Sequence, residues 1–372
     1  MNDPKLSKTT NQDRRHFLKS SAAVGAAAAI GGLSAFDARA AGKVGAVMPG
    51  VFMPKAGRPI VEKTAGVKLE NIPYVSPTDT LAKIMAPGGT SRYDLMISVT
   101  EFVRGPIMGA KAGDERVMAL DMGKIPNASK IMPLFKNDVV MRNGKTYMVP
   151  LVWGYDSVIY NKKFLNENDP NTQAWSVLFD DKHAGKVALR DEPHQSVMVA
   201  ALAMGHKDPV SMDGKDLKEV EKFLISKKKN FRTLWSKFGE ALNLISSGEV
   251  YAMYGWIAMR SRLQKQGHDV TNNWPKEGLL IWNQSGFIPK QAPNADGAHA
   301  VINAMLDSQF GKVLTEVTNY PSTSAEVANF FDKAEQKKLG LDIRERGVAL
   351  YPLKWPKRMD LWIETWGRFK AA

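Results

Sequence analysis

The chain has 372 residues, 44% of them hydrophobic, so it is long and apolar enough for two globular domains with packed cores. It contains no cysteine, which excludes disulfides, thiolate metal sites, a cysteine nucleophile and a lipid-bearing N-terminal cysteine. Its 51 Lys and Arg against 38 Asp and Glu give a formal net charge of +13, which leaves an anionic ligand or a negatively charged docking surface open.

The N-terminus has the organisation of an export signal. The RRHFLK segment at residues 14–19 precedes a mildly apolar run rich in Ala and Gly, and Ala38-Arg39-Ala40 forms a small-x-small cleavage site. This pattern resembles a twin-arginine signal, with Asp13 where Ser or Thr is usual. A membrane anchor is the alternative, but the run is shorter than the ~20 apolar residues that span a bilayer. We therefore expect export by the twin-arginine translocase, cleavage after Ala40 and a soluble periplasmic protein, which argues against a nucleic-acid partner.

The first third of the chain alternates strand and helix patterns. Strand patterns cover residues 44–48, 67–74 and 93–98, and helix patterns cover residues 59–64 and 78–85. Such alternation predicts a parallel α/β sheet, in which ligands bind beyond the carboxyl ends of the strands. The loops at residues 49–53 and 98–102 are therefore expected at the mouth of a site.

Two runs of similar composition, each with a strand pattern that contains a Trp and a Gly, lie far apart in the sequence. Residues 149–161 are apolar, β-branched and aromatic with Gly154 inside the run, and residues 279–289 again place a Trp and then a Gly in a strand pattern. A glycine inside a strand marks a bend or a close backbone approach. We interpret the two runs as crossings between two lobes that hold a ligand between them. Two ordinary core strands are the alternative.

The middle of the chain has the pattern of a second α/β unit. Strands are expected at residues 186–190 and 250–256, and helices at 196–204, 216–228 and 232–246. Helices are also expected at 298–306 and 310–319, and mostly helix from residue 332. The predicted organisation is a signal peptide at 1–40, a first lobe at 41–153 and 284–324, a second lobe at 154–283, and a C-terminal helical segment at 325–372 that packs on the lobes.

The sequence lacks recognisable catalytic and cofactor motifs. It has no phosphate-binding glycine loop, zinc-spaced histidine pair or nucleophile elbow, so neither a cofactor nor a metal site is expected. The histidines lack metal-ligand spacing and are interpreted as surface or capping residues. Glu101, Asp191 and Glu192 could form a carboxylate pair for acid–base chemistry, but no nucleophile accompanies them.

Three strand ends combine an aromatic residue with small or polar neighbours. They are Trp153-Gly154, Gly255-Trp256 and Trp282-Asn283-Gln284. Rigid rings flanked by polar groups suit a small-molecule cleft, because they supply apolar area or cation–π attraction at little entropic cost. Any one of these Trp residues could equally be core, but their shared context favours a site.

Several segments together match the pattern of one family. They are residues 149–161, 175–191, 248–256, the WPKEG segment at 274–278, 282–289 and 319–321, in the same order over nearly the whole mature chain. On these segments the chain resembles the spermidine/putrescine-binding periplasmic proteins of ABC importers. The resemblance implies a two-lobed type II periplasmic-binding fold, with the cleft between lobes joined by two crossover strands, that delivers one solute to a transmembrane permease.

The resemblance implies that carboxylates hold the ammonium groups of a polyamine and that aromatic rings flank its methylene chain. Trp256 and Trp282 keep aromatic positions of the family, Phe52 stands where a Tyr is usual, and Glu192 beside Asp191 keeps an acidic position. The aromatic part of the family's site is therefore expected here.

The acidic part of the family's site is mostly replaced. Val51, Gln195 and Gln284 stand where the family usually carries carboxylates. Pro49 replaces a Trp, and Glu101 lies near a position that is usually Tyr. A small organic solute other than a polyamine is therefore expected. The expected ligand-binding residues are Phe52, Glu101, Trp153, Asp191, Glu192, Gln195, Trp256, Trp282 and Gln284.

Three functional hypotheses follow. The first is a periplasmic solute-binding protein that closes about the two crossings and passes its solute to the permease of an ABC importer. The second is an exported enzyme that folds before translocation, which a bound chromophore or metal would favour. The third is a basic surface-binding protein without a small ligand, whose cleft would be empty and rigid.

Overall fold

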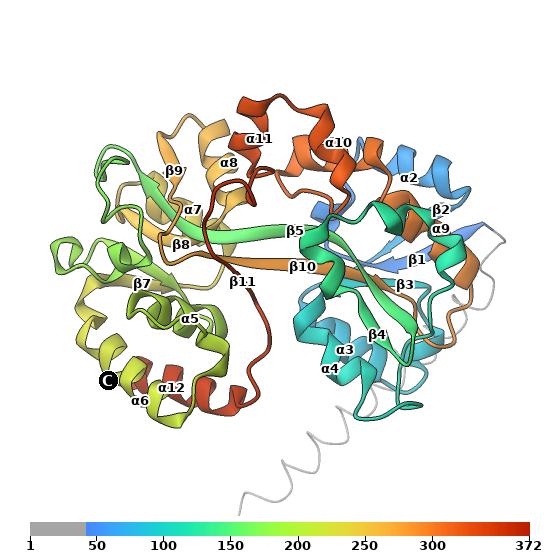
Figure 1. Cartoon of the computed structure of the whole chain (residues 1–372), viewed down its shortest axis with the longest axis horizontal. Helices are drawn as coiled ribbons and strands as arrows, with labels where there is room; N and C mark the ends of the chain where they lie inside the picture. Colours follow the sequence, from blue (N-terminus) through green and yellow to red (C-terminus); the bar gives the residue numbers. More distant parts are fainter. Residues whose placement is uncertain (1–41) are drawn as a thin grey trace, which may run out of the picture. The chain divides into compact units, whose positions relative to one another are not determined.

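Two long strands, β5 (Lys145–Asn161) and β10 (Leu279–Phe287), run side by side through the centre of the fold (Figure 1). They are antiparallel, with Trp282 opposite Gly154 and Asn283 opposite Trp153. The structure is a computed structural model that describes residues 42–372, and residues 44–372 form one compact unit. The twin-arginine segment and the expected cleavage site lie outside the described residues.

The described strands form one mixed sheet that continues through both lobes. Its order is β2-β1-β3-β10-β5-β8-β6-β7, with β11 on β10 and with β4 and β9 on β5. The parallel pairing that the alternation of strands and helices predicts is present, since β1 is parallel to β3 and β6 is parallel to β7 and β8, but β10 is antiparallel to β3 and β5. The crossing strands thus join two parallel units of the kind the sequence predicts.

Lobe 1 is built around the β10 side of the sheet. Its strands are β1 (Lys43–Val47), β2 (Lys68–Ile72), β3 (Leu95–Val99) and β4 (Val140–Arg142), and its helices are α2 (Arg58–Ala65), α3 (Pro77–Met85), α4 (Thr100–Met108), α9 (Ala295–Met305) and α10 (Ser308–Thr318). Local sequence explains the helix ends: Ser76 caps α3 through the amide of Asp79, and Gly66 ends α2 in the left-handed conformation.

Lobe 2 is built around the β8 side. Its strands are β6 (Val187–Arg190), β7 (Phe231–Trp235), β8 (Ala252–Trp256) and β9 (Val270–Asn272), and its helices are α5 (Pro193–Ala203), α6 (Gly214–Ser226), α7 (Phe238–Ser246) and α8 (Ile257–Lys265). Trp175, Leu189, Leu224 and Trp235 belong to its fully buried core, whereas Val61, Ile97 and Phe310 belong to a separate buried cluster in lobe 1.

The C-terminal segment crosses from one lobe to the other. After α11 (Lys333–Leu339) the chain adds β11 (Leu350–Pro352) beside β10 and then forms α12 (Met359–Ala371), which packs against α5 and α6 of lobe 2 (Figure 1). This segment is less helical than the sequence predicted, because β11 and irregular chain separate its two helices.

Two local expectations were wrong. Residues 232–246 were predicted as one helix, but Phe231–Trp235 forms β7, which pairs with β6 and buries Trp235. Helix α7 begins only at Phe238. Residues 98–102 were expected to be a loop, but β3 ends at Val99 and α4 starts at Thr100. For β7, pairing with the distant strand β6 decided the conformation.

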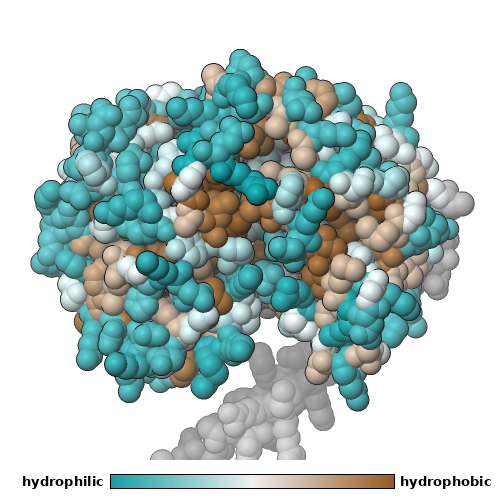
Figure 2. Space-filling model, viewed as in Figure 1, coloured by the Kyte–Doolittle hydropathy of each residue, from teal (hydrophilic) through white to brown (hydrophobic). Residues whose placement is uncertain are grey.

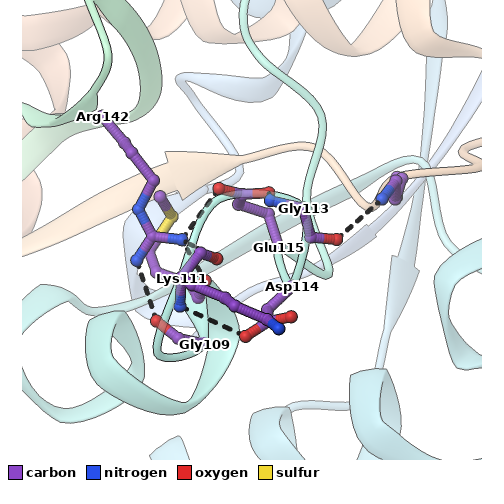
Figure 3. A network of polar contacts seen from close by, with 8 residues as sticks. Gly109, Lys111, Gly113, Asp114, Glu115 and Arg142 are labelled. Carbon is purple, nitrogen blue, oxygen red and sulfur yellow. Dashed lines mark hydrogen bonds and ion pairs between the residues drawn. The ribbon is translucent and has the colours of Figure 1, made fainter.

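A network of hydrogen bonds and an ion pair links the 109–116 loop of lobe 1 to Arg142 (Figure 3). Arg142 Nη1 donates to the carbonyl oxygens of Met108 and Lys111 at 2.7 and 2.6 Å, and Nη2 donates to that of Gly109 at 2.8 Å. The same guanidinium is 2.8 Å from Glu115 Oε1. One side chain on β4 therefore satisfies the carbonyls at the end of α4 and in the loop after it.

Candidate ligand-binding cleft

A cavity of about 520 Å³ lies where the two lobes meet the crossing strands. Small-molecule sites have volumes of about 300–1,000 Å³. Side chains from η1 (Gly50–Phe52) and β3 in lobe 1, from β6, α5 and β8 in lobe 2, and from β5 and β10 line it. Residues 74–78 of lobe 1 and Leu353 and Trp355 of the C-terminal segment also line it. Figure 2 shows hydrophobic residues near the centre of one face, with hydrophilic residues around them.

Three aromatic rings form one wall of the cavity. Trp282 of β10 meets Tyr320 edge to face with ring centroids 5.4 Å apart, and Tyr320 meets Phe52 in the same way at 5.7 Å. Edge-to-face contacts of this kind hold the rings in fixed orientations. The wall is therefore a rigid apolar surface on which a small solute can lie.

Gly154 and Asp156 of β5 set the position of Trp282. A Cβ atom on Gly154 would lie 2.8 Å from Trp282 Cη2 and closer still to Cζ2, so only glycine leaves room for the indole. Trp282 Nε1 donates a hydrogen bond of 2.8 Å to Asp156 Oδ1. The expectation that Gly154 marks a close approach is confirmed, although the approach is by a side chain.

Asp156 is a fully buried carboxyl at the base of the cavity. Tyr254 Oη donates to its second oxygen, Oδ2. Burial raises the pKa of Asp156 to about 7, because desolvation of the carboxylate outweighs the hydrogen bonds from Tyr254 and Trp282. Both oxygens of Asp156 therefore already accept a hydrogen bond from the protein, and the group is only partly ionised at neutral pH.

Lobe 2 contributes one basic and one acidic side chain. Arg190 is the last residue of β6, and its guanidinium carbon lies 5.0 Å from the ring centroid of Trp256. Glu192 caps α5 by accepting a 2.9 Å hydrogen bond from the amide of Gln195. Burial raises the pKa of Glu192, an effect that this capping bond and Arg190 partly offset. The cleft therefore contains opposite charges and is not uniformly acidic.

Two glutamine side chains leave hydrogen-bonding capacity in the lining. Gln195 Oε1 and Gln284 Oε1 are buried and have no hydrogen-bond partner among the described residues. Gln284, on β10, is only 8% exposed. A buried polar atom without a partner costs free energy in the empty protein. Both residues that carry these unsatisfied oxygens line the cavity.

The C-terminal segment contacts both lobes at the cleft. Trp355 packs edge to face on Phe102 of lobe 1 at 4.9 Å and on His194 of lobe 2 at 5.6 Å. His194 Nε2 also donates to the carbonyl oxygen of Lys354 at 3.0 Å. Burial lowers the pKa of His194 to about 4, so this imidazole is neutral at neutral pH.

The structure brings six of the nine expected ligand-binding residues together. The cavity lining includes Phe52, Glu192, Gln195, Trp256, Trp282 and Gln284. Trp153 lies elsewhere, fully buried against Phe135 with its Nε1 donating to the carbonyl oxygen of Ser322. Asp191 lies at the surface of lobe 2, where it accepts from Trp366 Nε1 at 2.8 Å and from Lys370 Nζ at 2.9 Å.

Glu101 lines a separate small cavity with Asp138. Burial raises the pKa of Glu101, and it raises that of Asp138 to about 6 with a further contribution from the charge of Glu101. Asn283 Nδ2 donates to Asp138 at 2.8 Å. The carboxylate that sequence comparison placed in the ligand site thus lies in a neighbouring cavity.

Asp156, Arg190 and Tyr320 line the cavity but were not among the expected residues. A pattern in the sequence could have indicated Asp156, because it is the one acidic residue inside the apolar run at 149–161. Arg190 likewise stands at the carboxyl end of a predicted strand, immediately before Asp191. Tyr320 lies in the 319–321 segment that contributes to the family resemblance, which could have indicated it.

Within residues 42–372, no group of three or more His, Asp or Glu side chains is arranged to hold a metal ion. None of the helices described there combines the length and apolar character needed to cross a bilayer.

Comparison with protein families identifies the family to which the chain belongs. Residues 55–339 match the family of bacterial extracellular solute-binding proteins, and residues 11–31 match the twin-arginine translocation pathway signal sequence. The chain belongs to this family of solute-binding proteins. It is an exported periplasmic solute-binding protein of an ABC importer.

Individual relatives agree with this placement. The chain is 26% identical over 290 residues to spermidine/putrescine-binding periplasmic protein 1 of Haemophilus influenzae, covering 78% of this chain and 75% of the relative. It is 25% identical over 329 residues to the putrescine-binding periplasmic protein SpuD of Pseudomonas aeruginosa, covering 83% and 87%.

Solved structures share the fold. A spermidine/putrescine ABC transporter substrate-binding protein from Streptococcus pneumoniae superposes with a TM-score of 0.76 at 19% identity, covering 89% of this chain and 99% of that one. The binding protein MotA of A. tumefaciens, in complex with glucopine, gives 0.68 at 16% identity, covering 88% and 99%. The two-lobed type II fold predicted from the sequence is confirmed.

Proposed function

We propose that this binding protein captures a small organic solute with a single ammonium group, closes its lobes around it and delivers it to the transmembrane permease of an ABC importer. The observation that carries the proposal is the charge of the cavity lining. It holds two carboxyls, Asp156 and Glu192, and one guanidinium, Arg190. Asp156 is only partly ionised at neutral pH, since burial raises its pKa to about 7.

This lining does not provide partners for both ammonium groups of a diammonium solute. Each ammonium group loses its water shell on closure, and a buried charge without a partner costs several kcal/mol. Among the described residues, Glu192 accepts from the backbone amide of Gln195 and from no side chain, so it can bind one ammonium group. The positive charge of Arg190 disfavours a second one. Gln195 and Gln284 offer neutral acceptors, which suit a neutral or singly charged solute better than a doubly charged one.

The names of the relatives support an organic nitrogen compound and also a range of ligands. Relatives are named for spermidine, putrescine and agmatine, and neighbours in fold were solved with glucopine and agropinic acid. The aromatic wall of Phe52, Tyr320 and Trp282 suits the apolar chain of such a solute. Trp256 supplies a ring from the opposite lobe.

Lobe closure and passage to the permease are further parts of the proposal. The two lobes are joined by β5 and β10, and the cavity lies where they meet. Ligand contacts made to both lobes stabilise the closed form alone, which is how a solute drives a hinge. The twin-arginine translocase is the proposed partner during export, in line with the match at residues 11–31.

Calorimetric titration of the mature protein tests the proposal. Putrescine and spermidine are expected to bind with Kd above ~10 µM, which is a binding free energy weaker than about −7 kcal/mol, and unbranched monoamines to bind more tightly. Trp282→Ala and Trp256→Ala should abolish binding, while Phe164→Ala, which removes a ring outside the cleft, should not. Small-angle scattering should show compaction on saturation. Sub-micromolar polyamine affinity would refute the single-ammonium proposal.

A further inference from the structure

Arg190 is a cation in the cleft without an acidic partner in contact. Its guanidinium lies over Trp256 at 5.0 Å and over Trp235 at 6.0 Å, measured to the ring centroids. No described residue makes a hydrogen bond or an ion pair with it. The positive charge of Arg190 acts to lower the pKa of Asp156 and of Glu192, but neither carboxyl is within ion-pair distance of the guanidinium.

The aromatic contacts do not satisfy the guanidinium. Its planar fork carries five N–H donors, and a ring face attracts the charge without accepting those hydrogens in line. A carboxylate matches the fork with two parallel hydrogen bonds. The N–H groups of Arg190 at the end of the cavity beside Trp256 can therefore donate hydrogen bonds to an oxyanion.

The lining offers acceptors as well. Gln284 Oε1 on β10 is buried and without a partner among the described residues, and the carboxyl of Asp156 lies at the edge of the Trp282 indole, where it accepts from Nε1. An ammonium group fits acceptors of this kind beside the faces of Trp282 and Tyr320. The lining therefore has partners for both signs of charge.

We infer that the solute is bipolar: besides its ammonium group it carries a carboxylate, which Arg190 binds through its guanidinium fork. This inference rests on the proposed function and specifies the solute class of the same site. It also gives Arg190 a role in specificity, since its positive charge repels the second ammonium of a diamine of equal length.

Probes of matched chain length test this directly. Unbranched ω-amino carboxylates of three to six carbons are titrated by calorimetry beside the monoamine and the diamine of the same length. The wild-type protein should prefer the best amino carboxylate over its monoamine by about 10- to 100-fold, the range expected for hydrogen bonds to a charged group.

Variants assign the preference to Arg190. Arg190→Gln should reduce it to less than about threefold, and Arg190→Lys, which keeps the charge but loses the fork, should give an intermediate value. Arg232→Gln is the matched control, because it removes the same charge from an exposed side chain on neighbouring β7 that pairs with Glu249. Thermal unfolding of each variant verifies that it is folded.

Each outcome decides the matter. Equal binding of monoamine and amino carboxylate to the wild-type protein, or a preference that survives in Arg190→Gln, overturns the inference and leaves the proposed function standing. If no compound with an ammonium group binds, both fall. A preference lost in Arg190→Gln and kept in Arg232→Gln supports both.

Discussion

Replacing Asp156 by Asn should change how the stability of the protein depends on pH. Asn has nearly the shape of Asp, and its oxygen can still accept from Trp282 Nε1 while its amide donates to Tyr254 Oη. The substitution therefore keeps the local hydrogen bonds and removes only the titration. Its effect reports the cost of ionising Asp156 in its buried position.

The sign follows from the raised pKa. Burial brings the pKa of Asp156 to about 7 in the folded protein, against ~3.9 for an unfolded chain. Between these values the folded protein holds a proton that the unfolded chain has lost, so the free energy of unfolding falls as pH rises. From about pH 5.5 to about pH 8.5 this contribution amounts to about 2 kcal/mol.

Urea unfolding followed by circular dichroism measures the effect. The free energy of unfolding is determined at both pH values for the wild-type protein and for Asp156→Asn. The difference between the two proteins cancels titrating groups that do not interact with Asp156, such as Asp138. The wild-type protein should lose about 2 kcal/mol more than the variant over this range. An equal pH dependence in the two proteins, or the opposite sign, would refute the reasoning.

Two further substitutions test contacts described above. Gly154→Ala should displace the indole of Trp282 and destabilise the protein by about 1–3 kcal/mol, as overpacking does, with loss of solute binding; unchanged calorimetric affinity would contradict the role of Gly154. Arg142→Met should leave the carbonyl oxygens around the 109–116 loop unsatisfied and make that loop the first site of limited proteolysis, while solute affinity stays unchanged. Cleavage at the wild-type rate would show that the network in Figure 3 is dispensable.

The sequence predicted the crossing strands because their signal is local and strong. Both are long apolar runs, and the glycine in the first stands where a bulky ring approaches. Helices α2 and α3 were also predicted near their true ends, since the residues that begin or end them lie beside them in the chain. Strand β7 was missed because its conformation depends on pairing with β6.

Trp153 shows why part of the site could not be predicted. Trp153 and Trp282 both follow apolar residues and precede small or polar ones, but Trp282 pairs opposite Gly154 and Trp153 opposite Asn283. Paired residues share a face of the sheet and successive residues alternate, so the two indoles point to opposite faces. The pairing register of β5 and β10 decides which of the two indoles lines the cavity. This register cannot be predicted from the sequence of either strand alone.

Asp191 illustrates the same limit for charge. It is adjacent to Glu192, yet its partners Trp366 and Lys370 come from α12 near the end of the chain. The two neighbouring carboxyls therefore have different environments that only the assembled fold distinguishes. Arg190 and Asp156 were present in the predicted strands, but their approach to the same cavity depends on how β5, β6 and β8 are ordered in the sheet.

The place of β10 in the sheet also constrains the order of folding. This strand, at Leu279–Phe287, lies between β3 and β5, and α12 at Met359–Ala371 packs on α5 and α6. Neither lobe can complete its core on the ribosome until its late segments have been synthesised, and contacts between residues so distant in sequence form slowly. Folding therefore finishes only once synthesis is nearly complete, and the matched signal belongs to an export route for proteins that fold before transport.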